Sequence, residues 1–266
     1  MAHPSPAPPP LSGGVVVSLR GVGKTYANGV VALDHLDLDV RPGEFLSLLG
    51  PSGCGKSTAL RLIAGLSEPT AGTVEWPRDA TSERAHEIGF VFQEPTLMPW
   101  TTVTSNVRLP LDLQHLDPGK AAVRVDAALE RVGLADFAGV YPRELSGGMK
   151  MRTSIARALV TEPSLLLMDE PFAALDEITR FKLNDDLLSL WASLRKTVVF
   201  VTHSVFESVY LSNRIVVMTP SPGRVFTELA IGAPHPRDRK FRTSAEYAAL
   251  CRQASEALAA AAGGEP

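Results

Sequence analysis

The chain has 266 residues, of which 45% are hydrophobic and 21% are charged, and its formal net charge is -3. These values predict a globular protein of one or two domains, and they disfavour nucleic-acid binding, which depends on a strongly basic surface. Two cysteines form no disulfide framework and suit a reducing compartment. No apolar run approaches the roughly 20 residues that cross a bilayer, and we expect no signal peptide.

The first residues are rich in proline and end in Ser-Gly-Gly, so residues 1–14 are predicted to form a disordered tail. A first strand is expected from Val15. Leu36 and Leu38 alternate with aspartates, which is typical of a half-buried strand. Tyr26 lies between these strands. It has two possible roles, an ordinary structural tyrosine or an aromatic ring that stacks on a nucleotide base.

A phosphate-binding loop is the strongest motif in the chain, because residues 50–58 match G-x-x-x-x-G-K-[ST] at every fixed position. An apolar run enters the loop and a helical stretch leaves it, which is the context that the motif needs. Glycines allow the backbone N–H groups to point at phosphate oxygens, and the helix start adds partial positive charge. The loop consists of Gly50, Pro51, Ser52, Gly53, Cys54, Gly55, Lys56, Ser57 and Thr58.

Polar side chains end two further apolar strands. Residues 88–92 lead to Gln93, and residues 165–168 lead to Asp169 and Glu170. A continuous apolar run is typical of a strand in a parallel sheet, and such sheets bind ligands at the carboxyl ends of their strands. Asp169 therefore suits a role in holding Mg²⁺, Glu170 suits polarising a water molecule, and Gln93 can reach a metal or water.

Between these strands, residues 94–145 contain turn signals and helical stretches, including one with Val125, Ala128, Leu129 and Val132 on one face. We predict a helical insertion in an α/β domain. Its segment 97–100, Leu-Met-Pro-Trp, is unusually apolar for a loop. Local packing under the insertion and a protein-docking patch are both open readings of that segment.

A second anion-binding helix start is predicted at Ser146-Gly147-Gly148, followed by a helix through Val160. After Asp176 comes a helix whose apolar stripe is predicted to be core. A strand over residues 197–201 leads to His203, and further strands are expected at 214–218 and 225–231. A weakly amphipathic helix is expected near 245–260. The stripe after Asp176 comprises Leu183, Leu187, Leu190, Trp191 and Leu194.

In this order, the motifs resemble the nucleotide-binding subunit of an ABC transporter over about residues 15–231. Met-Pro-Trp at 98–100, Met149 and the run from Pro171 to Arg180 most resemble the ATPases of nitrate, sulfonate or taurine-type importers. The resemblance implies an α/β P-loop NTPase fold, with a RecA-like core, an antiparallel β subdomain and a helical subdomain over about residues 94–155. Residues 232–266 would form a partly helical C-terminal extension.

The resemblance also implies roles for individual residues. Tyr26 would stack on adenine, the phosphate loop would hold ATP, and Ser57, Gln93 and Asp169 would serve Mg²⁺. Glu170 would be the catalytic base and His203 the switch histidine, while Gln93 would sense the γ-phosphate. Ser146, Gly147 and Gly148 would bind the γ-phosphate of ATP held by the other subunit of a homodimer, and Asp176 would be a further ATP-binding residue.

Partners follow from the same resemblance: integral-membrane permeases, with an extracytoplasmic solute-binding protein acting indirectly, at the cytoplasmic face of the membrane. Met149, Met151 and Ser204 depart from the commonest pattern of the family. None of them removes a catalytic group, so these departures concern coupling and tuning.

Two other classes of function remain open. An ABC ATPase without transport, such as a cofactor-assembly ATPase, would share all of these motifs and differ in lacking membrane partners. A small-molecule P-loop kinase would lack the Ser-Gly-Gly helix and His203, and it would transfer phosphate to an acceptor. The transported solute is not encoded in this chain.

Overall fold

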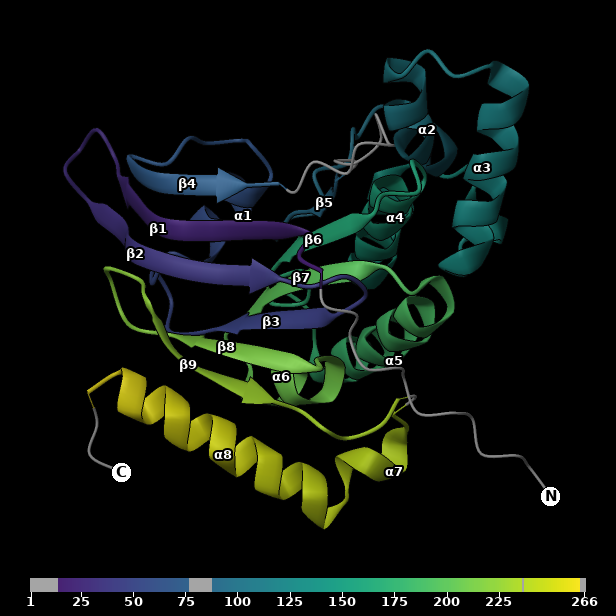
Figure 1. The fold of residues 1–266 in the computed structure, drawn as a ribbon. Coiled ribbons are helices and arrows are strands. Elements are labelled where there is room, and N and C mark those ends of the chain that lie inside the picture. Colours follow the sequence, from purple (N-terminus) through teal and green to yellow (C-terminus); the bar gives the residue numbers. More distant parts are fainter. Residues whose placement is uncertain (1–13, 77–87, 236, 264–266) are drawn as a thin grey trace. The chain divides into compact units, whose positions relative to one another are not determined.

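The computed structural model describes residues 14–76, 88–235 and 237–263 (Figure 1). Almost all of the predicted disordered tail therefore lies outside the described residues. The chain divides into two compact units. Unit 1 comprises Met1–Arg78 and Trp191–Pro266, and unit 2 comprises Asp79–Leu190.

Unit 1 contains a three-stranded antiparallel sheet, made of β1 (Val17–Thr25), β2 (Val31–Val40) and β4 (Ala71–Glu75) in the order β2-β1-β4. Leu19 pairs with Leu38, and both side chains are buried. The predicted alternation in β2 is confirmed, because Leu36, Leu38 and Val40 are buried while Asp37 is exposed. Such a sheet packs one face on a core and leaves the other toward solvent.

A second sheet in unit 1 runs in the order β7-β3-β8-β9 and comprises β3 (Phe45–Leu49), β7 (Thr197–Thr202), β8 (Arg214–Met218) and β9 (Val225–Ala230). The first three strands are parallel, and β9 is antiparallel to β8. Every residue of β3, β7 and β8 is buried. Their apolar sequences therefore suit strands covered on both faces, and the α-helix α1 (Lys56–Ile63) follows β3 directly.

An ion pair is buried in unit 1 beside the second sheet. Arg214 on β8 donates to both oxygens of Glu44, at 3.1 and 2.7 Å, and Glu44 is completely buried. The same guanidinium donates to Glu228 on β9 and to the carbonyl of Asp39 on β2. Removing one partner of such a pair leaves an uncompensated charge, so Arg214 joins the two sheets at a point where substitution is costly.

Unit 2 contains a parallel pair of strands, β5 (Ile88–Val91) and β6 (Leu165–Asp169), with helices around it. The helices are α2 (Val103–Leu113), α3 (Pro118–Arg131), α4 (Gly147–Leu159) and α5 (Glu177–Leu194), with short 3₁₀ turns at Ala135–Phe137 and Pro142–Glu144. Side chains cap the starts of these helices. In α3, for example, the Asp117 side chain accepts a hydrogen bond from Lys120 N, and Pro118 is the first residue of the helix. The helical insertion expected from the sequence is thus present, and its four predicted apolar residues are buried.

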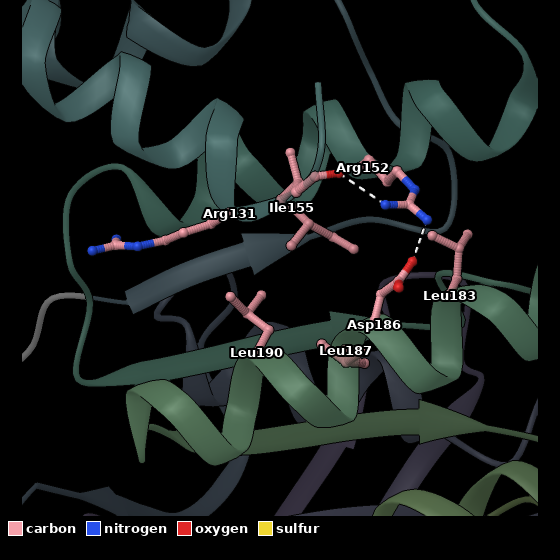
Figure 2. A pocket seen from close by; sticks show the side chains of 8 residues that line it. Arg131, Arg152, Ile155, Leu183, Asp186, Leu187 and Leu190 are labelled. Carbon is pink, nitrogen blue, oxygen red and sulfur yellow. Dashed lines mark hydrogen bonds and ion pairs between the residues drawn. The ribbon is translucent and has the colours of Figure 1, made fainter. Parts of the chain in front are cut away.

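The stripe predicted for α5 is only partly right. Leu183 and Leu187 are buried, but Leu190, Trp191 and Leu194 are only half-buried, and the prediction missed Asn184 and Leu188. In Figure 2, Leu183, Leu187 and Leu190 of α5 line a small pocket opposite Ile155 of α4. A helical repeat alone does not reveal which apolar residues of the stripe their neighbours cover.

The same pocket is bounded by an arginine that joins three elements of unit 2. Arg152 on α4 donates to the carbonyl of Val132, just after α3, at 2.8 Å, and it also pairs with Asp186 on α5 (Figure 2). Its side chain is largely covered. The guanidinium therefore links the end of α3 and the middle of α5 to α4, and we assign it a structural role.

The end of the chain folds back on unit 1. α8 (Ala245–Ala261) contacts α6 (Val205–Leu211), β8 and β9, and α7 (Arg239–Arg242) precedes it (Figure 1). α8 buries Tyr247, Cys251 and Ala254. Across the described ranges, no helix combines the length and apolar character needed to span a membrane.

His235 lies in the segment that leads to these helices. Its ring meets the edge of Trp191 with a centroid separation of 4.8 Å, and neither ring nitrogen has a hydrogen-bond partner within the described part of the chain. Burial, with a smaller contribution from the nearby charge of Arg237, lowers the pKa of His235 from 6.5 to about 3. The imidazole is therefore neutral in the folded protein at physiological pH.

We predict that acid weakens unit 1 through His235. Between pH 6.5 and 3 the unfolded chain binds a proton that the folded chain rejects, so the free energy of unfolding falls as pH decreases through this range. Thermal unfolding at pH 7.5 and 5.0 should show a larger loss of Tm for the parent than for His235→Phe, which keeps the contact with Trp191. An equal loss of Tm in both proteins would contradict the assignment.

Candidate nucleotide-binding site

The predicted phosphate loop connects β3 to α1 in unit 1, as expected from the sequence. Gly53 and Gly55 have φ angles of 78° and 95°, in the left-handed region that favours glycine. Lys56 is the first residue of α1, so the loop delivers the chain into the helix start. The backbone N–H groups of a helix start attract anions.

Two glycines let other segments of unit 1 come unusually close to this loop. A Cβ on Gly55 would lie 2.6 Å from the carbonyl oxygen of Ala32, and one on Gly223 would lie 2.0 Å from that of Cys54. Gly223 also donates to Ala32 O at 2.9 Å and accepts from Asp34 N at 3.1 Å. The loop is therefore held between β2 and the turn that joins β8 to β9.

Gly223 is a residue that the sequence analysis missed. Its only signal is the stretch Thr-Pro-Ser-Pro-Gly between two apolar strands, which indicates a turn but not what the turn touches. The contact becomes visible only when β2 and the β8–β9 turn are brought together by the fold. Gly223 supports the loop from outside the motif.

Lys56 is buried within the loop, with 3% of its surface exposed. Its ammonium group donates to the carbonyl oxygens of Gly50 at 2.7 Å and Pro51 at 2.9 Å. These two carbonyl oxygens fix the position of the ammonium group inside the phosphate loop. This geometry supports the predicted role of Lys56.

Cys54 is a buried neighbour of Lys56 with no evident chemistry. Its side chain is 1% exposed, and its Sγ lies 3.9 Å from the Lys56 nitrogen. Burial raises the pKa of the Cys54 thiol, against the opposing influence of Lys56. A protonated thiol is a poor nucleophile, so Cys54 serves as a small residue that fills the loop.

Tyr26 comes directly after β1 and lies beside α1. Its hydroxyl is 3.0 Å from the hydroxyl of Thr58, and the Lys24 ammonium lies 5.5 Å from its ring centroid. The side chain is 36% exposed, so its ring is not a core residue. Tyr26 thus lies next to the phosphate loop with an aromatic surface accessible to a ligand.

In unit 2, the structure brings Gln93 and the two carboxylates to one edge of the strand pair. β5 and β6 are parallel and Val91 pairs with Met168, so the chain reaches Gln93 and Glu170 two residues later on the same side. Asp169 is 7% exposed, Glu170 is half-buried and Gln93 is exposed. Carboxyl ends of parallel strands are where such sheets bind ligands.

Glu170 has an uncommon backbone conformation. Its φ angle is 44°, in the left-handed region, where a residue of this type costs about 1–3 kcal/mol. The turn is held by a hydrogen bond from Ala173 N to Glu170 O and by Phe172, which is 1% exposed. Strained residues of this kind cluster at functional sites, so the backbone angle supports Glu170 as a candidate functional residue.

Ser146 caps α4, as predicted. It has extended backbone angles, and its hydroxyl accepts from Met149 N at 3.3 Å. A Cβ on Gly148 would lie 2.8 Å from Thr179 on α5, so the loop packs closely against the start of that helix. Asp176 caps α5 by accepting from Thr179 N at 3.0 Å, and these hydrogen bonds lower the pKa of its carboxyl.

His203 is exposed and follows β7 in unit 1. Ser204, where this sequence departs from the commoner aspartate, caps α6 by accepting from Glu207 N at 3.3 Å. Serine and aspartate are comparable helix caps. Ser204 therefore preserves the helix cap after His203 and lacks only the negative charge of an aspartate.

A P-loop NTPase of the α/β class is what this fold and site define. Comparison with protein families extends that assignment, because the ABC transporter family matches residues 33–173, just over half of the chain. An uncharacterised ABC transporter ATP-binding protein of Methanocaldococcus jannaschii is 46% identical over 87% of each chain. The aliphatic sulfonates import ATP-binding protein of Bacillus subtilis is 46% identical over 78% of this chain and 80% of its own.

Solved structures agree. A dimeric ATP-binding cassette in a post-hydrolysis state with ADP and Pi is 36% identical and covers 81% of this chain and 98% of its own, with a TM-score of 0.69. The cbiO1 subunit of Clostridium perfringens, part of an ABC transporter complex, covers 82% of this chain and 89% of its own, at 28% identity and a TM-score of 0.72. The chain belongs to the ABC transporter family and is an ATPase of that family.

The contact at Gly223 predicts a loss of ATP affinity on substitution. Gly223→Ala places a methyl group against the Cys54 carbonyl and must displace the phosphate loop. We expect the Kd for ATP to rise about 10-fold or more, which is about 1.4 kcal/mol. Gly139→Ala is the control, because a Cβ there has nothing within 4 Å. Equal ATP affinity of the two variants by equilibrium titration would show that the contact does not shape the loop.

Proposed function

We propose that this chain is the ATP-binding and ATP-hydrolysing subunit of an importer for a small solute of the nitrate, sulfonate or taurine class. The observation that carries the proposal is that the two segments predicted to bind anions both form helix starts, α1 in unit 1 and α4 in unit 2. The sulfonate-import names of the Bacillus relatives support the direction of transport and the solute class.

In this proposal the phosphate loop binds ATP and Tyr26 stacks on its adenine. Ser57 and Asp169 hold Mg²⁺, with Gln93 contributing an amide oxygen. These side chains supply the hard oxygen donors that Mg²⁺ prefers. When bound, Mg²⁺ neutralises charge on the β- and γ-phosphates.

Hydrolysis is assigned to the residues at the strand ends. Glu170 acts as the base that orients and deprotonates water, and His203 and Gln93 contact the γ-phosphate. Phosphoryl transfer demands mainly positioning and electrostatic stabilisation. A strained, half-buried Glu170 and a Lys56 held by carbonyls supply fixed groups of this kind.

The second helix start implies a homodimer. In this proposal Lys56 serves one triphosphate, so Ser146, Gly147 and Gly148 can serve the ATP of a second copy. Asp176 caps α5, the helix against which Gly148 packs. Ser146 and Gly147 are exposed, as such a role needs. Two ATP molecules would then be enclosed by two chains, and the dimeric state of a related cassette supports this arrangement.

A substitution at Glu170 tests the shared site. Glu170→Gln keeps size and polarity but cannot accept a proton, so hydrolysis should slow about 100-fold or more while ATP still binds. Size-exclusion chromatography with saturating ATP and Mg²⁺ should then show a dimer for the variant and mainly monomer for the parent. Release of Pi measures the hydrolysis rate on the same samples.

The control adds Ser146→Arg to Glu170→Gln. A long side chain at the cap of α4 should block the second phosphate contact, so the double variant should stay monomeric and still bind ATP. A Glu170→Gln protein that remains monomeric with bound ATP would contradict the shared site. A dimer that also forms with Ser146→Arg would show that the dimer interface lies elsewhere on the chain.

We propose that the loop 97–100 attaches this chain to its permeases. Trp100 is 73% exposed, which argues against local packing as its role. The loop is nevertheless fixed, because the buried Asn106 side chain accepts from Met98 N at 2.7 Å and donates to the carbonyls of Met98, Thr101 and Thr102. A large apolar group on a rigid, exposed loop suits a docking contact with an integral-membrane protein.

Trp100→Ala should separate ATPase activity from attachment. We expect the isolated variant to hydrolyse ATP at the parent rate, because Trp100 is remote in sequence from every nucleotide motif except Gln93. Co-purification with membrane proteins from detergent extracts should fall at least several-fold. Leu113→Ala is the matched control, since Leu113 is an equally exposed apolar residue of unit 2. Undiminished recovery of membrane partners by Trp100→Ala would contradict the docking role.

The remaining assignments follow from this function. We propose an ATPase domain over residues 15–231, with a helical subdomain at about 94–155, and a C-terminal extension after it. The protein would lie at the cytoplasmic face of the membrane, bound to its permeases and served indirectly by a solute-binding protein. A cofactor-assembly ATPase is the alternative, and absence of any membrane partner in the co-purification would favour it.

A further inference from the structure

Residues of the C-terminal extension form hydrogen bonds with α6, the short helix that begins two residues after His203. Tyr247 on α8 donates its hydroxyl hydrogen to the carbonyl of Phe206 at 3.0 Å. Arg237 donates to the carbonyls of Val209 at 2.7 Å and Tyr210 at 2.8 Å. The Tyr210 hydroxyl returns a hydrogen bond to the Arg237 carbonyl at 3.1 Å. Both ends of α6 are therefore fixed by residues beyond position 231.

Arg237 is a buried cation compensated by a helix end. Its surface is 5% exposed, and burial lowers its pKa to about 10, so it remains charged at neutral pH. Carbonyls of the last helical turn carry partial negative charge and have no partner within the helix. The guanidinium occupies that position on α6, and it also donates to Ala233 O at 2.9 Å. Because a buried charge is costly without such partners, the Arg237 side chain favours this position at the end of α6 over others.

At its other end, α6 is tied to the backbone on both sides of His203. Thr202 donates its hydroxyl hydrogen to the Glu207 carboxylate at 2.6 Å, and this bond is buried. Ser204 N donates to the Thr202 hydroxyl at 3.0 Å, and Glu207 N donates to the Ser204 hydroxyl at 3.3 Å. The histidine is thus the exposed middle residue of a small ring of hydrogen bonds closed by the first turn of α6.

We propose that Arg237 and Tyr247 are positioning residues for His203 and that the C-terminal extension acts on ATP hydrolysis through α6. The inference rests on the proposed function, in which His203 contacts the γ-phosphate. α6 is a single short helix of seven residues, so we expect that loosening its far end shifts the ring that holds His203. Ground-state binding of ATP depends on the phosphate loop, which these residues do not contact.

The test measures kcat and the Kd for ATP on the full-length chain. Arg237→Met removes the cation with little change in volume, and we expect kcat to fall about 10-fold with the Kd for ATP within about twofold of the parent. Arg237→Lys should recover part of the rate. Tyr247→Phe removes the hydroxyl that donates to the Phe206 carbonyl and also contacts Cys251, and it should lower kcat about threefold. Arg252→Met on the exposed side of α8 should match the parent.

A double-mutant cycle with His203→Ala separates positioning from general loss of structure. If Arg237 acts through the histidine, the variant with both changes should be no slower than His203→Ala alone. A further full loss in the double variant, or a parent-like rate for Arg237→Met and Tyr247→Phe while His203→Ala is slow, would overturn this inference alone. A parent-like rate for His203→Ala would overturn the assigned role of His203 and the inference with it.

Folding of each variant is checked by thermal unfolding. If Arg237→Met does not fold, the cycle is carried out with Tyr247→Phe and Arg237→Lys. Tyr247→Phe keeps the aromatic contacts with Tyr210 and Phe241, and Arg237→Lys keeps a positive charge next to the last turn of α6. Non-additivity with His203→Ala supports the inference in these variants too, and additivity overturns it.

Discussion

The close approach of backbone to backbone around the phosphate loop is the constraint on which unit 1 depends. β2 lies against Gly55 from one side, and the β8–β9 turn lies against Cys54 at Gly223 from the other. Neither contact leaves room for a side chain. The loop therefore has its shape imposed by strands far away in the sequence, which is how a flexible, glycine-rich segment becomes a fixed set of donors.

Backbone carbonyls, more than carboxylates, hold the important cations of this chain. Lys56, Arg157 and Arg237 each donate to two or more carbonyl oxygens, at Gly50 and Pro51, at Pro95 and Thr96, and at the end of α6. Arg214 is different, because Glu44 neutralises it inside the core. These carbonyls fix Lys56 inside the phosphate loop, and Arg157 holds Pro95 and Thr96 just before the segment that carries Trp100.

How much the sequence could predict depended on how local each signal was. The phosphate loop, the capped start of α4 and the strand ends at Gln93 and Glu170 are contiguous motifs, and their predicted positions were confirmed to within a residue or two. Gly223, Arg237 and Glu207 escaped notice because their importance comes from partners distant in the chain or hidden by an ordinary helix pattern. The α5 stripe failed for a related reason, since neighbours decide which apolar residues are covered.

At position 170, the residue that best fits the backbone angle differs from the residue that the proposed chemistry needs. Glycine or asparagine would occupy a φ of 44° at lower cost, so selection for stability alone would replace the glutamate. Retaining a carboxylate there means that the rest of unit 2 holds it in place, with Phe172 anchored in the core beside it. Under the role proposed for Glu170, variants stabilised by glycine or asparagine at position 170 would lose the base, and a screen that scores only folding would favour them.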